Sequence, residues 1–220
     1  MPGFLYHFAC SEYVLQNRSD LQNEVDRDAF LLGNVIPDLA KDKDISHFRS
    51  VQVNGWRTPN LTVAKKRLLE DPNPLKLGCY CHLFLDHFFI TRHLAKRCAL
   101  VFDGRVIEFP RDRIYDVEVF LSERGLYGSY DAGNAILINQ CLLPKDYLKL
   151  TEDPPPTGLE ELDDRSEKNW HTQVDRYLKN ITNESTNVFT PTELKDITMD
   201  GARAFLNDII SLQLHQKTVR

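Results

Sequence analysis

The chain has 220 residues, of which 42% are hydrophobic and 27% are charged, and its formal net charge is −5 at pH 7. This composition is that of a folded globular protein and excludes a disordered one. The acidic balance disfavours tight, non-specific binding to nucleic acid, which needs a basic surface. A small acidic substrate would therefore need a local positive charge, such as a bound metal ion.

Targeting and membrane signals are missing from the sequence. The first residues, MPGFLYHFACSEYVL, lack the basic start, the long apolar run and the cleavage site of a secretory signal. The longest apolar candidate is interrupted by Asp86, His87, Arg92 and His93, so it is too short to span a membrane. We therefore expect a protein without a transmembrane segment that is either cytoplasmic or a mature form whose leader has been removed. The five cysteines, an odd number, predict buried reduced thiols and no disulfide framework.

Strand signals are few and helical periodicity dominates the chain, which predicts an all-α fold. We expect a single multi-helix domain over residues 1–220. Helices are predicted over residues 5–17 and 26–34. Thr58-Pro59 predicts a helix over 59–70, because proline is favoured at the first helical position. A prolyl turn at 71–74 then leads into a long predicted helix over 75–100.

The second half of the chain is less regular. Asp103-Gly104 predicts either a hairpin or a loop over residues 101–112. Helical periodicity resumes over 113–142, and a proline-rich linker is predicted near 151–158. A polar helix is predicted over 159–181. Thr190-Pro191-Thr192-Glu193 has the pattern of a capping box, which predicts a last helix that reaches residue 216.

The segment GCYCHLFLDHFF places ionisable side chains in an apolar stretch. Burial of such groups costs several kcal/mol unless they are paired or bind a metal. His82 and Asp86 are four residues apart, so on a helix they share one face at a separation of about 5.4 Å. An imidazole and a carboxylate in this arrangement suit one zinc ion. Such a pair is also common as a simple hydrogen-bonded histidine.

Two other segments strengthen the metal hypothesis. In LGNVIPD an acidic residue, Asp38, ends an apolar stretch, and His47 follows nine residues later in KDISHF. His7 lies among apolar and aromatic residues in the first predicted helix.

Taken in order, the motifs LGNVIPD, K-x-x-SHF and LGCYCHLFLD resemble the zinc-dependent phospholipase C family, especially its compact bacterial branch. That fold is shared with single-strand-specific zinc nucleases and 3′-nucleotidases. The resemblance covers roughly the first hundred residues, and beyond them the chain is similar only in being helical.

The resemblance implies two or three Zn²⁺ ions in a cleft of an all-α domain. By this resemblance Asp38, His47, His82 and Asp86 are ligands of one zinc ion. Asp86 also bridges to a second ion, which His7 helps to bind. In the family an amino-terminal tryptophan completes that second site. This chain has no tryptophan there. Pro2 would become the amino-terminal residue if Met1 is removed, and whether its amine binds the ion is left open.

For a third ion the resemblance implies one further histidine and a later His-x-x-x-Glu or His-x-x-x-Asp pair. His171 and Asp175 in the polar predicted helix have this spacing. His93 is the candidate for the further histidine, and His87 is the alternative. Since His93 lies eleven residues beyond His82, about 16 Å along a continuous helix, it cannot share an ion with His82 unless that helix breaks.

The activity implied by the resemblance is hydrolysis of phosphoric esters by zinc-activated water, with Asp38 as the catalytic residue that accepts a proton. The substrate would be a phospholipid or a small phosphoester. The sequence shows no amphipathic basic helix for membrane binding and no basic, aromatic stretch for single-stranded nucleic acid. A phosphodiesterase or phosphomonoesterase therefore stands beside a phospholipase, and the oligomeric state is left open.

Two rival hypotheses arise from the same residues. An HD-type phosphohydrolase requires adjacent His-Asp on a helix, but this chain has the reverse order, Asp86-His87, and that hypothesis is disfavoured. A non-catalytic helical protein with a structural or vestigial metal site is the other alternative.

Overall fold

The computed structural model describes residues 3–101, 104–109, 112–123, 125–140, 142–143, 154–165 and 188–218, with side chains up to residue 212 in the last range. Its α-helices are α1 (Phe4–Gln16), α2 (Glu24–Gly33), α3 (Ile36–Leu39), α4 (Lys43–Ser46), α5 (Leu61–Leu68), α6 (Pro74–Phe89), α7 (Ala95–Arg97), α8 (Val117–Leu121), α9 (Leu126–Asn139), α10 (Glu160–Asp163) and α12 (Pro191–Thr218). The described residues also form a 3₁₀ helix, η1 (Ser19–Leu21), and a π-helix, η2 (Ile90–Leu94). The strands are β1 (Arg49–Val53), β2 (Trp56–Pro59), β3 (Cys98–Leu100), β4 (Arg105–Glu108) and β5 (Arg113–Asp116).

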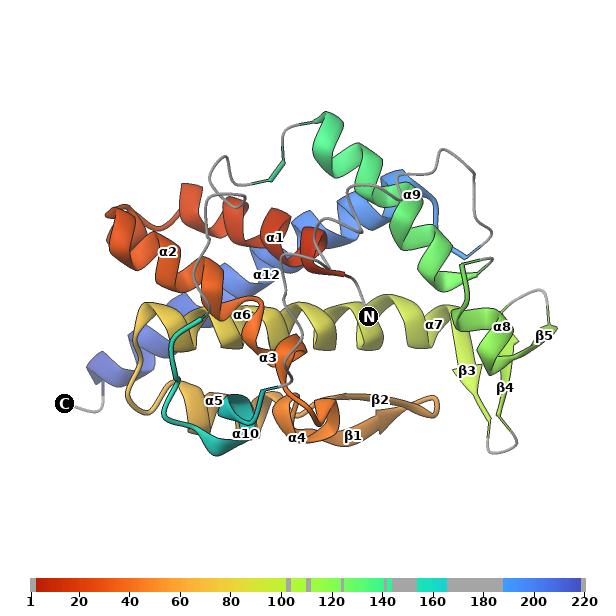
Figure 1. The fold of residues 1–220 in the computed structure, drawn as a ribbon, viewed down its shortest axis with the longest axis horizontal. Coiled ribbons are helices and arrows are strands. Elements are labelled where there is room, and N and C mark those ends of the chain that lie inside the picture. Colours follow the sequence, from red (N-terminus) through yellow and green to blue (C-terminus); the bar gives the residue numbers. More distant parts are fainter. Residues whose placement is uncertain are drawn as a thin grey trace.

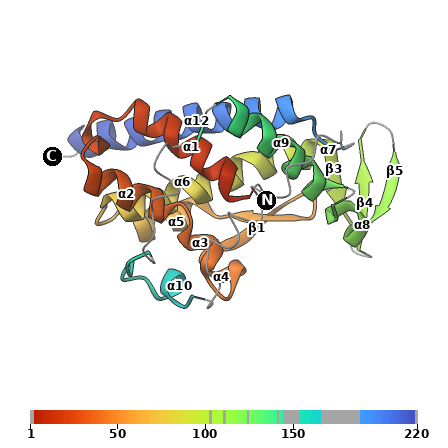
Figure 2. The same cartoon turned by 45° about the horizontal axis from the view of Figure 1, so that its top comes forward.

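Helix α6 runs through the middle of the molecule and packs against α1, α2, α5 and α12 (Figure 1). Helix α12 lies along both α1 and α9 (Figure 2). Twelve of the sixteen residues of α6 are buried, because its sequence is apolar on nearly every side. A central helix of this kind brings its few polar residues, His82 and Asp86 among them, into the core.

Helices α2 and α6 touch backbone to backbone at two glycines. A Cβ on Gly78 would lie 2.1 Å from the carbonyl oxygen of Phe30, and one on Gly33 would lie 2.1 Å from that of Leu75. No side chain fits at either position, so glycine permits the close approach. The contact places the end of α2, and with it Asn34, beside the middle of α6.

The fold is mostly α-helical, and it also contains two small antiparallel sheets that the all-α prediction lacked. The first is the hairpin β1–β2, which turns at Asn54-Gly55. Both turn residues have positive φ, 49° and 79°, as in the primed turns that suit hairpins. The second sheet has the order β3-β4-β5. Strand β4 lies within the predicted range 101–112, but its hairpin partner β3 precedes that range, so the predicted hairpin is confirmed only in part.

Several predicted helix boundaries need correction. Pro59 ends β2, and α5 starts only after Asn60, whose side chain accepts hydrogen bonds from the backbone N–H groups of Thr62 and Val63. The helix predicted over 75–100 changes to the π-helix η2 at Ile90 and gives way to β3 at Cys98. The helical segment predicted over 113–142 begins instead with β5, and α8 and α9 follow.

Other predictions for the second half agree with the structure in part. At the start of α12, the Thr190 N–H donates to Glu193 and the Glu193 N–H donates to the Thr190 hydroxyl, so the capping box is confirmed. Of the polar helix predicted over 159–181, the structure has the short α10. The prediction is wrong at Asp164 and Arg165, because the chain leaves the helix after Asp163 and Arg165 forms a β-bridge with Ala40. Residues 166–181 lie outside the described residues. The linker near 151–158 and the single-domain organisation stay predictions.

The sequence also predicts buried reduced cysteines and no transmembrane segment. Among the described cysteines, all four are buried free thiols, in agreement with the sequence: Cys10, Cys79, Cys81 and Cys98. Within the described part of the chain, no helix combines the length and the apolar character needed to cross a bilayer.

Candidate metal centre

Five of the predicted ligands converge on one place in the core. His7 comes from α1 and Asp38 from α3, whereas His47 directly follows α4. His82 and Asp86 lie one turn apart on α6. The three histidines and Asp86 are at most 1% exposed, and only Asp38 is partly open to solvent.

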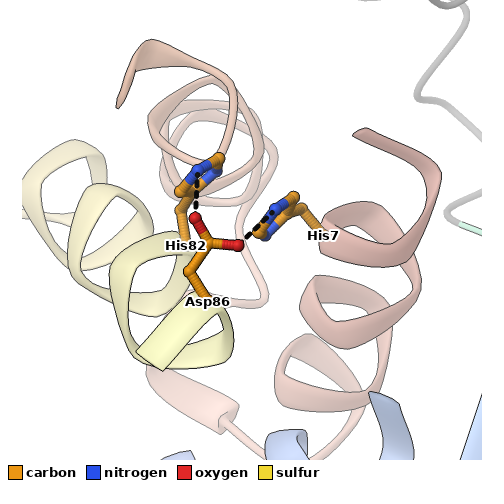
Figure 3. A group of neighbouring side chains, drawn as sticks. All are labelled: His7, His82 and Asp86. Atoms are coloured by element: carbon orange, nitrogen blue, oxygen red, sulfur yellow. Dashed lines mark ion pairs between the residues drawn. The ribbon is translucent and has the colours of Figure 1, made fainter. Parts of the chain in front are cut away.

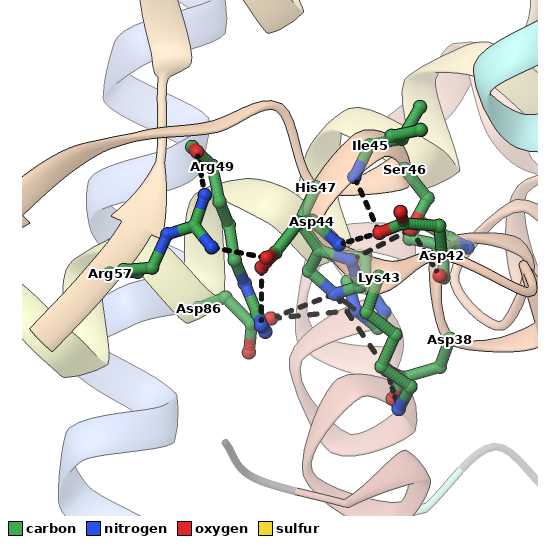
Figure 4. Close-up of polar contacts among 12 residues, drawn as sticks. Asp38, Asp42, Lys43, Asp44, Ile45, Ser46, His47, Arg49, Arg57 and Asp86 are labelled. Atoms are coloured by element: carbon green, nitrogen blue, oxygen red, sulfur yellow. Dashed lines mark hydrogen bonds and ion pairs between the residues drawn. The ribbon is translucent and has the colours of Figure 1, made fainter.

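The Asp86 carboxylate lies among the three imidazoles (Figures 3 and 4). Its Oδ1 is 3.6 Å from His7 Nε2, and its Oδ2 is 3.4 Å from His47 Nε2 and 3.6 Å from His82 Nε2. The His7 ring stacks on the His82 ring with the centroids 3.7 Å apart. Asp38 reaches the same place from the other side, with Oδ1 3.7 Å from His47 Nε2.

Two groups of three side chains have the spacing of metal ligands. One comprises His7, His82 and Asp86, and the other comprises Asp38, His47 and His82. Within each group the candidate ligand atoms lie no more than 4.8 Å apart. Because His82 belongs to both groups, they form one continuous centre.

Hydrogen bonds orient two of the imidazoles. His82 Nδ1 lies 2.7 Å from the carbonyl oxygen of Asn34, so it must carry the proton and donate. The Ser46 hydroxyl donates to the carbonyl oxygen of Pro37, so the same hydroxyl oxygen accepts the proton of His47 Nδ1 at 3.0 Å. Both Nε2 atoms, which are 3.3 Å apart, are therefore left with lone pairs directed at each other and at Asp86.

The centre contains buried polar atoms that have no hydrogen-bond partner in the part of the chain that the structure describes. Among the described residues, no hydrogen-bond partner faces either nitrogen of His7 or either carboxylate oxygen of Asp86. Buried polar atoms in this state cost free energy, and lone pairs that point at one another add repulsion. A cation removes both costs, and imidazole nitrogens with carboxylate oxygens are the ligands that zinc takes in proteins. The residues present thus fit zinc.

Burial sets the protonation of the centre. Desolvation lowers the pKa of His47 to about 3, and it also lowers the pKa values of His7 and His82. Desolvation raises the pKa of Asp86 to about 6. Around neutral pH the three imidazoles are therefore uncharged and Asp86 is ionised, which is the state that binds a metal ion.

We expect the zinc-free protein to lose stability as the pH falls from 7 to 5. Below pH 6.5 the unfolded chain protonates its histidines, whereas the folded chain keeps His7, His47 and His82 neutral, so protons favour unfolding. Protonation of Asp86 favours the folded state as the pH falls from about 6 to 4, because its pKa is raised on folding. This single group is outweighed by the three histidines. Thermal unfolding in the presence of a chelator measures the effect, and a melting temperature that stays constant over this range would contradict it.

His93 and His87, two further candidate ligands, lie outside this centre. His93, in η2, is half-buried beside Phe88, with ring centroids 5.4 Å apart, and does not join the centre. His87, the alternative, has Nδ1 2.9 Å from the carbonyl oxygen of Pro59. His171 and Asp175 lie outside the described residues.

Sequence reasoning missed the two groups that orient the imidazoles, the Asn34 carbonyl and the Ser46 hydroxyl. The available signal was their place within the motifs LGNVIPD and SHF.

Fold and site together define a class of protein: a mostly α-helical chain with a buried histidine–carboxylate centre that fits zinc. A comparison with family models identifies the particular family. The chain belongs to the zinc dependent phospholipase C family, whose model matches residues 6–189. The match extends well beyond the segment that carries the three motifs. Comparisons with curated proteins and with solved structures find no match. Family membership supports a zinc-dependent phosphoester hydrolase in general terms.

Proposed function

We propose that the protein hydrolyses phosphoric esters with zinc held by His7, Asp38, His47, His82 and Asp86. The observation that carries the proposal is the convergence of unpartnered nitrogen and carboxylate lone pairs in one buried centre. The family supports the same conclusion, since its name joins zinc to the cleavage of a phosphoester bond.

The residues of the centre have distinct tasks. Bound zinc would supply Lewis-acid polarisation of a phosphoryl oxygen and would lower the pKa of a water molecule. Asp86 lies among the imidazoles and suits a bridging position between the two groups of ligands. Asp38 is 12% exposed, so it is the cluster carboxylate that an incoming water molecule can reach. We assign Asp38 the role of proton acceptor as well as ligand.

The substrate belongs to one of two classes, a phospholipid or a smaller phosphoester, which is either a phosphodiester or a phosphomonoester. The family favours a lipid. We keep His171, Asp175 and His93 as proposed ligands of a third zinc ion. In the described structure, His93 would need a different arrangement of η2 to contribute, because it lies beside Phe88.

Metal analysis combined with activity tests the proposal. We expect the purified protein to hold zinc and to hydrolyse bis-p-nitrophenyl phosphate, and the activity to disappear with chelator and return with zinc. His82→Ala should lose both zinc and activity, because His82 belongs to both ligand groups. His87→Ala is the matched control on the same helix and should keep both.

Two results would count against this function. A protein that stays inactive on phosphoesters, including phosphatidylcholine vesicles, after zinc reconstitution is not such a hydrolase. If His82→Ala loses the fold while the wild type never shows activity, the metal is structural, as the non-catalytic alternative holds.

A further inference from the structure

Lys43 is the one charged residue of the motif K-x-x-SHF that the metal centre does not use. It opens α4, four residues before His47. Its Nζ donates to Asp38 Oδ1 at 2.7 Å, and its side chain is 48% exposed (Figure 4). A cation thus lies between a ligand carboxylate and solvent.

The burial of the centre makes this position important. Four of the five clustered side chains are at most 1% exposed, and Asp38 is the member in contact with solvent. A substrate that approaches from solvent therefore meets the edge formed by Asp38 and Lys43. An ammonium group has three N–H donors, and Asp38 takes one of them, which leaves donors for a second anion.

Neighbouring acidic groups do not neutralise Lys43. The carboxylate of Asp44, the next residue, accepts a hydrogen bond from Arg57 and another, at 3.5 Å, from Arg49 (Figure 4). The Asp42 carboxylate accepts hydrogen bonds from the backbone N–H groups of Asp44 and Ile45 at the start of α4. The positive charge of Lys43 is therefore balanced by Asp38 alone among these carboxylates. Zinc bound to Asp38 would neutralise the same carboxylate. The ammonium group of Lys43 would then be available to bind a substrate anion.

We propose that Lys43 binds the substrate phosphate at the entrance to the metal centre and so favours esters with the more negatively charged phosphate group. The proposal rests on the proposed function, because it names a recognition residue of that same site. Lysine is a compact point charge, and its attraction for a phosphate group grows with the charge of that group. A phosphomonoester, with up to two negative charges, gains more from Lys43 than a phosphodiester, with one.

The test compares Lys43→Met with Lys41→Met in the zinc-loaded full-length protein. Lys41 is a matched control, because it lies on the same segment and pairs with a different carboxylate, Asp164, at 2.6 Å. Binding of inorganic phosphate is measured by calorimetry, alongside zinc content. We expect Lys43→Met to keep its zinc and to bind phosphate about tenfold or more weakly, the value of a charged hydrogen bond. Lys41→Met should match the wild type, and Lys43→Arg should recover part of the affinity.

Kinetics supply a second measurement. For Lys43→Met we expect KM to rise more than kcat falls, and to rise further for p-nitrophenyl phosphate than for bis-p-nitrophenyl phosphate. A purely structural role would affect both esters equally.

The proposal is overturned if phosphate binds Lys43→Met as well as the wild type. It is also overturned if zinc is lost together with phosphate, since Lys43 would then only position Asp38. The phosphate titration needs no turnover, so it decides the proposal even if the protein hydrolyses no ester. The failure of the proposed function is seen separately, as absent turnover.

Discussion

Asp86→Asn is expected to remove zinc from the centre and to lower the hydrolytic rate by about 100-fold or more, because loss of a group that only orients a metal ligand already costs about 10- to 100-fold at other sites. Asp86 is the side chain that contacts all three imidazoles, at 3.4–3.6 Å. Asparagine keeps the shape of the side chain but removes the negative charge that a bridging ligand needs. Zinc content and the rate on bis-p-nitrophenyl phosphate measure the two effects.

The same substitution should have the opposite effect on the zinc-free protein. Asp86 is fully buried, neither of its oxygens has a hydrogen-bond partner among the described residues, and burial raises its pKa to about 6. At pH 7.5 the native state must therefore ionise a carboxyl group against its environment. Removal of that charge should raise the free energy of unfolding by up to about 3 kcal/mol.

Asp164→Asn is the control for Asp86→Asn, because Asp164 is exposed and pairs with Lys41 at the surface. It should change neither zinc content nor the stability of the zinc-free protein by more than about 0.5 kcal/mol. Full zinc occupancy in Asp86→Asn, or a large loss of stability in the zinc-free variant, would refute the assigned role.

Gly78→Ala is expected to destabilise the protein by about 3 kcal/mol, the upper part of the usual range for overpacking. The added Cβ would lie 2.1 Å from the Phe30 carbonyl oxygen and 2.9 Å from Gly33 Cα, which are both backbone atoms. Helices α2 and α6 would have to separate, and the hydrogen bond between Asn34 and His82 would lengthen with them. Unfolding in urea measures the loss of stability, and zinc titration measures the effect on the centre.

Gly201→Ala provides the matched control on α12. Its Cβ would meet the end of the Leu85 side chain at 2.6 Å, and such an end can rotate away. Alanine also favours a helix over glycine by about 1 kcal/mol. We expect Gly201→Ala to cost less than Gly78→Ala and to leave zinc affinity unchanged. Equal costs for the two variants would mean that the α2–α6 contact has no special importance.

The metal centre was largely predictable because its side chains carry the signal themselves. His82 and Asp86 share a helix face at a spacing visible in the sequence, and the motifs around Asp38 and His47 carry the family resemblance. The structure brings these residues and His7 together, and their binding of zinc stays a prediction. The Asn34 carbonyl could not be predicted, since a backbone acceptor is present at every residue and its position depends on the α2–α6 contact.

The strands were harder to predict because they are short and partly exposed. Asn54-Gly55 is a strong hairpin signal, but the alternation on its two sides spans only four or five residues. Pro59 suits both the first position of a helix and the end of an edge strand, and its neighbours do not decide between them. The change at Ile90 has no glycine or proline to mark it, so the helix was predicted to continue.

The sharing of His82 by both ligand groups has a consequence for metal uptake. An imidazole Nε2 has a single lone pair, so His82 can serve only one ion at a time. The first ion to arrive decides which donors are left for the next, and like charges only a few ångströms apart repel. Zinc ions should therefore bind in unequal, interdependent steps. A model of identical, independent sites should not fit the zinc titration curve.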